Sequence, residues 1–151
     1  MKDTDLAYIA GLVDGEGYIG FLKKKVQGWN PNHRIRVVIT NTDVGIVRWL
    51  FDSIPGSTVF FQDHCRKKRI YRWNIQGTKA YEFLRVILPY LRIKKAQAEL
   101  AIRFIETRTL YVFDKTGRKW GEKRIPETEI AMRENLYLEM KKLNSGTKIY
   151  S

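Results

Sequence analysis

The amino-acid sequence predicts an α+β fold in the order αββαββα, with an antiparallel sheet and further helices towards the C-terminus. Two stretches, 18–40 and 57–75, each contain two runs rich in β-branched and aromatic residues around a turn, which is typical of a β-hairpin. A segment with apolar residues at helical spacing precedes each hairpin. Because no shift in composition marks a linker within the 151 residues, we expect a single domain spanning 1–151.

The first half begins with a helix that leads into a long hairpin. Residues 3–5 offer an N-cap, and apolar residues follow at helical spacing until Gly15 and Gly17. The predicted strands are 18–25 and 34–40, joined by a loop.

The strand 34–40 alternates at period two. One face carries Ile35, Val37 and Ile39, and the other carries Arg34, Arg36, Val38 and Thr40. We therefore expect helices to cover one face of the sheet and the basic face to stay free of them.

The second half repeats this pattern with different residues. Asn41 or Thr42 caps a predicted helix that runs to about Ser53, and strands at 57–65 and 69–75 follow. The remaining predicted helices span 77–87, about 93–108, and Pro126 to about Leu143, with Pro89 and a loop at 113–123 between them.

The charge of the chain indicates its partners. A formal net charge of +12 favours nucleic acid, although a ribosomal-type protein, a binder of anionic membranes or simple solubility would also account for it. One cysteine excludes an internal disulfide, and neither histidine has the neighbours of a zinc site or a nucleophile triad. No run approaches the roughly 20 apolar residues that span a bilayer, so we expect no membrane-spanning segment, and we do not expect a membrane among the partners.

The most informative stretch lies at the end of the first helix. Gly11 costs about 1 kcal/mol relative to alanine inside a helix, and the pair Ala10-Gly11 would let a second copy of this helix cross closely. Asp14 and Glu16 lie where the helix dipole disfavours acidic side chains, and a cation such as Mg²⁺ would compensate. An ordinary acidic turn is the alternative interpretation.

A second unusual placement occurs near the start of the helix predicted at 93–108. Lys94 and Lys95 lie in its first turn, where positive charge opposes the helix dipole. This placement is mildly costly and indicates a role for at least one of these lysines.

The segment 9–17 resembles the LAGLIDADG motif, and the order αββαββα around it is similar to that of LAGLIDADG homing endonucleases. The resemblance extends to 40–43 with Arg48-Trp49, and to 88–98, in the manner of the single-motif homodimeric branch. It covers residues 5 to about 108 and does not extend to the C-terminal third. It implies the LAGLIDADG fold, with an antiparallel DNA-binding sheet.

The resemblance also implies roles for individual residues. Glu16 falls on the metal-binding carboxylate, with the backbone carbonyl of Gly15 in the same shell, and Lys94 falls on the active-site lysine. Asp43 stands where relatives often carry glutamine, and we expect it to act in catalysis. The contact between two copies is expected to involve Ile9, Ala10, Gly11 and Val13.

The implied function is that of a homing endonuclease. It would cut a long pseudo-palindromic double-stranded DNA site, with Mg²⁺ (or Mn²⁺) as cofactor, leave 3′ overhangs, act as a homodimer and need no small-molecule substrate. A cleavage-inactive RNA maturase or DNA-binding regulator on the same scaffold, and a ribosome-associated basic protein, are the alternatives. With helical structure expected by Leu6, we expect no targeting peptide, which leaves a prokaryotic or viral cytoplasm and an organelle's own genome open.

Alternation along the two hairpins predicts which residues contact DNA. In the fourth strand, polarity favours Arg72 and Asn74 on the DNA side, whereas the register of the resemblance favours Tyr71 and Trp73, which we adopt. The expected DNA-contacting residues are Lys24, Arg34, Arg36, Thr40, Gln62, His64, Arg66, Lys68, Tyr71 and Trp73.

Overall fold

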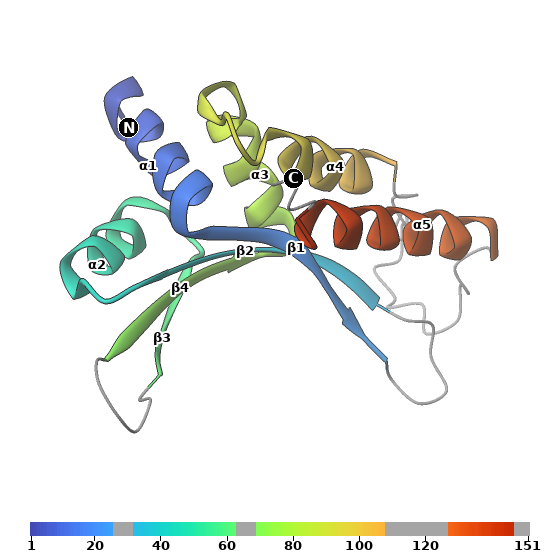
Figure 1. Cartoon of the computed structure of the whole chain (residues 1–151), viewed down its shortest axis with the longest axis horizontal. Coiled ribbons are helices and arrows are strands. Elements are labelled where there is room, and N and C mark those ends of the chain that lie inside the picture. Colours follow the sequence, from blue (N-terminus) through green and yellow to red (C-terminus); the bar gives the residue numbers. More distant parts are fainter. Residues whose placement is uncertain (26–31, 63–68, 108–126, 147–151) are drawn as a thin grey trace, which may run out of the picture.

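The computed structural model of the chain describes residues 1–25, 32–62, 69–107 and 127–146, with the side chain of Gln62 left out. The elements follow the predicted order (Figure 1). They are α1 (Asp3–Glu16), β1 (Gly17–Lys24), β2 (Asn32–Asn41), α2 (Val44–Ser53), β3 (Thr58–Gln62), β4 (Ile70–Gln76), α3 (Gly77–Ile87), the short 3₁₀ helix η1 (Leu88–Tyr90), α4 (Lys95–Glu106) and α5 (Glu127–Asn144).

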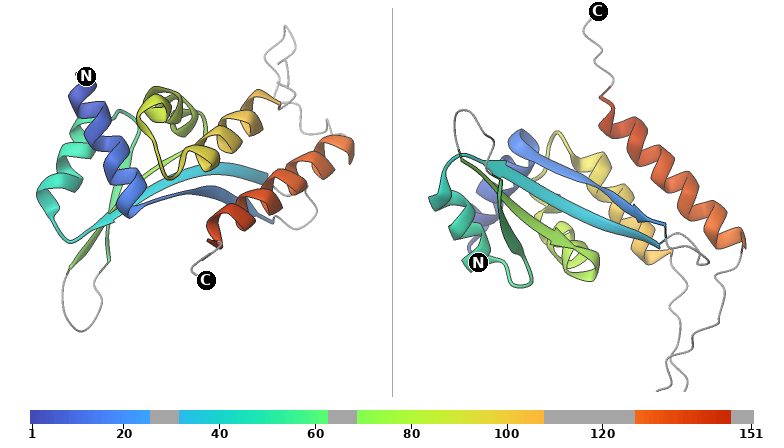
Figure 2. Two further views of the ribbon diagram at one scale, coloured as in Figure 1. Left: turned by 45° about the horizontal axis from the view of Figure 1, so that its top comes forward. Right: turned by 90° about the horizontal axis from the view of Figure 1, so that it is seen from below.

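The strands form one antiparallel sheet in the order β1-β2-β4-β3. Helices α1 to α4 lie over one side of the sheet, which arches so that its helix-free face is on the inside of the arch (Figures 1 and 2). The predicted α+β class, the element order and the helix-covered sheet are confirmed. No helix in the described ranges is long and apolar enough to cross a membrane.

The faces of β2 divide as the alternation predicts. Ile35, Val37 and Ile39 are fully buried beneath the helices, while Arg34 on the opposite face is exposed. The core also takes apolar side chains from every helix: Ile9, Ala10 and Val13 of α1, Val47 and Leu50 of α2, Leu84 and Ile87 of α3, Ala101 and Phe104 of α4, and Leu136 and Met140 of α5.

The prediction that Tyr71 and Trp73 face the helix-free side is wrong. Residues directly opposite in adjacent strands point to the same face, and Trp73 pairs with the buried Ile39, as Tyr71 pairs with Asn41. Trp73 is 0% exposed, and its ring packs 5.3 Å from that of Phe83. Burying this large aromatic side chain determines the orientation of β4 and places Arg72 and the buried Asn74 on the helix-free face.

Helix α2 begins one residue later than the sequence predicts. Its N-cap is Asp43, whose carboxylate accepts a hydrogen bond from the backbone N–H of Ile46 at 3.1 Å. Asn41 instead accepts from the backbone N–H of Asp43 at 2.8 Å, which shapes the turn before the helix.

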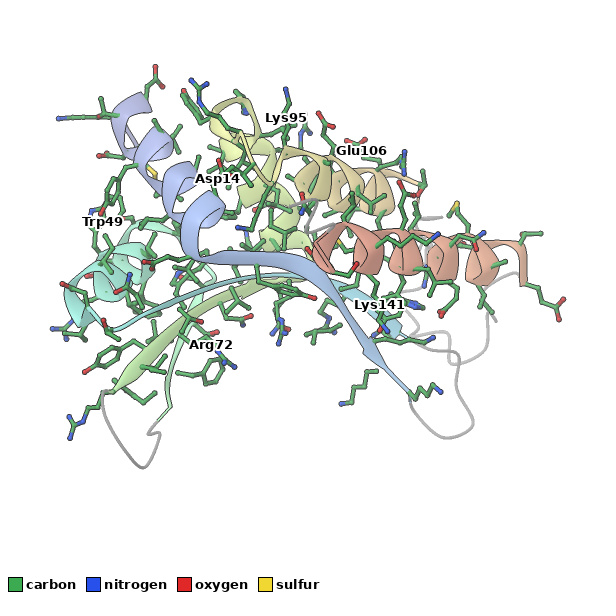
Figure 3. All side chains as sticks on the ribbon, viewed as in Figure 1. Asp14, Trp49, Arg72, Lys95, Glu106 and Lys141 are labelled. Carbon is green, nitrogen blue, oxygen red and sulfur yellow. The ribbon has the colours of Figure 1, made fainter. Side chains whose placement is uncertain are left out.

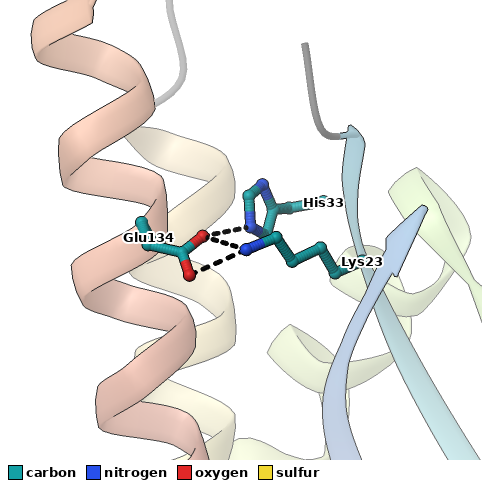
Figure 4. A network of polar contacts seen from close by, with 3 residues as sticks. All are labelled: Lys23, His33 and Glu134. Atoms are coloured by element: carbon teal, nitrogen blue, oxygen red, sulfur yellow. Dashed lines mark hydrogen bonds and ion pairs between the residues drawn. The ribbon is translucent and has the colours of Figure 1, made fainter. Parts of the chain in front are cut away.

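Helix α5 packs beside the outer strand β1 and closes that edge of the sheet (Figure 2). Glu134 on α5 binds Lys23 Nζ at 2.7 Å and contacts His33 Nε2 at 3.2 Å, as Figure 4 shows. Asn144 donates to the backbone carbonyl of Ile19 at 2.8 Å. The C-terminal helix is thereby tied to both strands of the first hairpin.

Replacing Trp73 tests the assigned orientation of β4. We expect Trp73→Ala to lower the free energy of unfolding by about 3–5 kcal/mol, because it empties a large space in the core. Phe60→Ala, on the exposed β3 strand, is the control and should change it by less than about 1 kcal/mol. Urea denaturation followed by circular dichroism measures both, and equal losses would contradict the assignment.

His33 makes stability depend on pH. Burial lowers the pKa of His33, and the hydrogen bond to Glu134 only partly opposes this, while Lys23 and Arg133 disfavour protonation further. The unfolded chain therefore binds the proton more tightly, so stability is complete above about pH 6.5 and falls as the pH drops towards the folded-state pKa.

We expect His33→Phe, which keeps an aromatic ring between Phe104 and Tyr137, to flatten the dependence of unfolding free energy on pH between 7 and 5. Chemical denaturation across that range measures the slope. Glu134 titrates mainly below this window, since hydrogen bonding to Lys23 lowers its pKa. Identical slopes in wild type and variant would show that His33 does not carry the effect.

Candidate active site and nucleic-acid interface

Glu16 lies where α1 passes directly into β1, with no loop between helix and strand. The position after Glu16 requires a glycine, since a Cβ atom on Gly17 would come within 2.6 Å of the Val13 carbonyl oxygen. The Glu16 side chain is exposed, and Asn41 Nδ2 donates a hydrogen bond to its Oε2. The last acidic residue of the motif is thus presented to solvent by a sharp, closely packed turn.

Lys94 is brought to this turn by Asp14. The Asp14 carboxylate accepts hydrogen bonds from the backbone N–H groups of Arg92 at 2.8 Å and Lys94 at 2.9 Å, and Lys94 Nζ donates to the Asp14 backbone carbonyl. Asp14, labelled in Figure 3, comes from the last turn of α1, whereas Lys94 is the N-cap of α4. Two of the predicted catalytic residues, Lys94 and Glu16, are therefore anchored at the same end of α1.

Burial and hydrogen bonding change the pKa values of Asp14 and Lys94. Burial would raise the pKa of Asp14, but backbone N–H groups of Lys94, Arg92 and Ile93 hydrogen-bond its carboxylate and bring the pKa below its ordinary value. Burial lowers the pKa of Lys94, and the negative charge of Asp14 offsets part of this. Lys94 consequently gives up its proton more readily than an exposed lysine does.

Asp43 has a structural partner, since its carboxylate caps α2. Its side chain is exposed, and its backbone N–H, not its carboxylate, is connected to Glu16 through Asn41. A catalytic role of Asp43 stays a prediction.

The described residues at the end of α1 offer some, but not all, of the ligands that a divalent ion takes. In the described ranges, no three His, Cys, Asp or Glu side chains are grouped closely enough to hold a metal. Asp14 already uses its carboxylate on backbone N–H groups, which leaves Glu16 and the exposed Gly15 to offer oxygen ligands at the end of α1. Mg²⁺ accepts such a sparse set, because it keeps several waters and takes one or two carboxylates together with phosphate oxygens.

The helix-free face of the sheet carries most of the predicted DNA-contacting residues that the structure describes. Lys24 and Arg34 are exposed there, and Arg36 and Thr40 are partly exposed. Gln62 belongs to β3, but its side chain lies outside the description, and His64, Arg66 and Lys68 lie outside the described residues.

Sequence reasoning weighed Arg72 and Asn74 for this face but set them aside, and it missed Gln76. Cross-strand pairing places Gln76 opposite Arg36, Asn74 opposite Val38 and Arg72 opposite Thr40, and Figure 3 shows Arg72 on the side away from the helices. The pairing of β2 with β4 was the missing information, because it joins strands that are not neighbours in the sequence.

Tyr18 was also missed, and it shapes the surface around Arg36. The Arg36 guanidinium lies 5.9 Å from the centre of the Tyr18 ring. That ring lies along β1, where a Cβ atom on Gly20 would come within 2.2 Å of its hydroxyl. The arginine therefore rests beside an aromatic ring for which Gly20 leaves the space.

The predicted contact between two copies needs correction. Ile9, Ala10 and Val13 are 0% exposed because they pack into the core of their own chain, so they are not available to a partner. Gly11 is exposed, and a Cβ atom added to it meets nothing within 4 Å. The open side of α1 carries small residues four positions apart, at Ala7, Gly11 and Gly15.

No protein-family model matches the sequence, and neither does any curated protein. Solved structures do match. I-CvuI, a homing endonuclease in complex with its target, aligns with a TM-score of 0.70 and 21% identity over 96% of this chain and 85% of that one. I-Vdi141I, an archaeal intron-encoded homing endonuclease complexed with DNA, aligns with a TM-score of 0.71 and 14% identity over 100% and 91%.

A third match is the LAGLIDADG homing endonuclease I-GzeII in complex with its DNA target, with a TM-score of 0.55 and 12% identity over 90% of this chain and 43% of that one. The chain has the LAGLIDADG homing-endonuclease fold. Structures of I-CvuI with DNA exist in the presence of 2 mM Ca and of 2 mM Mg, the latter with uncleaved DNA.

Proposed function

We propose that the chain is a site-specific double-strand DNA endonuclease that acts as a homodimer with a divalent cation. The observation that carries the proposal is the shared anchoring of Lys94 and Glu16 at the end of α1, produced by the Asp14 hydrogen bonds to the backbone of residues 92 and 94. A partly buried lysine with a lowered pKa and an exposed carboxylate at the same helix end are typical of a reacting site.

The helix-free face supports binding to duplex DNA. Its outward side chains include the basic residues Lys24, Arg34 and Arg36, and the net charge of +12 attracts the phosphate backbone. Arg34 and Arg36 can each donate two parallel hydrogen bonds to a guanine edge. The partly exposed Gln76 can donate to N7 of an adenine and accept from its N6 amino group. The matching structures of I-CvuI and I-Vdi141I are complexes with DNA, which supports the same partner here.

The chemistry assigned to the site is phosphodiester hydrolysis. Glu16 and the Gly15 carbonyl would hold Mg²⁺, or Mn²⁺ in its place, which supplies activation of water and charge stabilisation at the phosphate. Lys94 Nζ donates a hydrogen bond to a phosphate oxygen or to the attacking water, and its lowered pKa lets it release a proton more readily than an exposed lysine does. Water adds to phosphorus as the bond to the 3′ oxygen breaks, leaving a 5′ phosphate and a 3′ hydroxyl.

A second copy completes the proposed assembly. Contact through the open side of α1 brings both Glu16 carboxylates near a two-fold axis, which matches a pseudo-palindromic target. Each copy would cut one strand and leave 3′ overhangs, as the family resemblance implies. The proposal includes a gene within a mobile intron, as for the intron-encoded I-Vdi141I.

Cleavage of a randomised DNA library in Mg²⁺ tests the activity. We expect the wild type to cut a near-palindromic site, and Glu16→Gln and Lys94→Met to slow cleavage by about 10²–10⁴-fold, because each removes a group assigned to the reaction. Binding without metal should persist in both variants. The control is Glu99→Gln, an exposed position on α4. Binding by the wild type with no cutting would favour a DNA-binding regulator or an RNA maturase.

A substitution on the open side of α1 tests whether the protein is a homodimer. We expect Gly11→Lys to convert a dimer to a monomer in size-exclusion chromatography with light scattering, because a long charged side chain replaces the point of close approach. The fold should persist, since the position is open within the chain and the substitution gains about 1 kcal/mol of helix propensity. Glu99→Lys adds the same side chain elsewhere and should leave the dimer intact. A wild type that is monomeric with and without DNA would refute the assembly.

A further inference from the structure

Asn41 lies between three elements, at the end of β2, beside the last residue of α1 and before the first turn of α2. Its Nδ2 donates to Glu16 Oε2, and its Oδ1 accepts from the backbone N–H of Asp43 at 2.8 Å. Asp43 in turn caps α2 by accepting from Ile46 N–H at 3.1 Å. A continuous series of hydrogen bonds therefore runs from the N-terminus of α2 to the Glu16 carboxylate.

The polarity of this series sets the direction of the Asn41 amide. An asparagine amide offers an acceptor at one end and donors at the other. Because the Asp43 N–H requires the oxygen end, the NH₂ end is turned towards Glu16. The Asn41 backbone is held as well, since it pairs with Tyr71 in the sheet.

Within the described residues, Asn41 is the one hydrogen-bond partner of the Glu16 side chain. That side chain is exposed, and a free glutamate side chain keeps its rotamer freedom. The neighbouring acid cannot take over its place, since the Asp14 carboxylate is already bound by the backbone of Arg92 and Lys94. A hydrogen bond on one oxygen orients the carboxylate and leaves its other oxygen to bind a ligand.

We propose that Asn41 is a positioning residue for Glu16: it holds Oε2 from the end of β2 so that the carboxylate is set in advance to bind the divalent cation. This inference rests on the proposed function, in which Glu16 is the metal ligand. Partners that orient metal ligands typically contribute 10–100-fold to metal affinity, about as much as such a hydrogen bond can supply.

Asn41→Ser separates positioning from the shape of the turn. A serine hydroxyl can still accept from the Asp43 N–H, but it is too short to reach Glu16. Asn135→Ser, at an exposed position of α5, is the matched control for the same substitution.

The measurement is calorimetric titration of Ca²⁺ into the full-length protein bound to its selected DNA site, beside DNA affinity in EDTA and the melting temperature. For Asn41→Ser we expect the Ca²⁺ dissociation constant to rise by about tenfold. The Mg²⁺ concentration for half-maximal cleavage should rise in parallel, while DNA affinity in EDTA and the melting temperature match the control.

The outcomes separate this inference from the proposed function. If Glu16→Gln weakens Ca²⁺ binding and Asn41→Ser does not, the inference is overturned and the function stands. If Asn41→Ser lowers the DNA affinity in EDTA and the melting temperature as well as the Ca²⁺ affinity, the role of Asn41 is structural and the inference is overturned. If the wild-type complex takes up no Ca²⁺ saturably, or Glu16→Gln binds it as the wild type does, the proposed function fails and the inference with it.

Discussion

The arrangement of the candidate site depends on one interaction, the acceptance of two backbone N–H groups by the Asp14 carboxylate. The N–H groups before a helix have no partner within it, and an acidic side chain is a strong acceptor for them. Here the acceptor belongs to another helix, so the bond also joins α4 to α1. Asp14 lies at the negative end of α1, and this contact with the start of α4 compensates for that placement.

The same contact accounts for the unusual placement of Lys94. A lysine at the start of a helix is unfavourable by itself, yet its Nζ donates to the Asp14 carbonyl at the C-terminal end of α1, where a cation is favoured. The positive charge of Lys94 is thus stabilised by the C-terminal end of α1, although the residue lies at the start of α4. Its partial burial follows from this docking and lowers its pKa.

Helix α1 has one side buried in the core and one side exposed. Residues 9, 10 and 13 face the core, and Gly11 and Gly15 face outwards beside them. The motif reads as one stretch in the sequence, but helical geometry splits it into an inner side that holds the sheet and an outer side free for contact. The family resemblance predicts Ile9, Ala10 and Val13 at the dimer interface together with Gly11, but these three side chains fill the core of their own chain.

By itself the sequence determined the order of the helices and strands, the buried and open faces of β2, and the place of Glu16 at the end of a helix, because each depends on local periodicity, turn residues and charge. Only the tertiary structure decided which side of β4 faces outwards, which side of α1 is free, and that Asn41 meets Glu16. These features depend on contacts between distant segments. Trp73 packs in the core against Phe83 and opposite Ile39, and Asn41 reaches Glu16 because β2 ends beside α1.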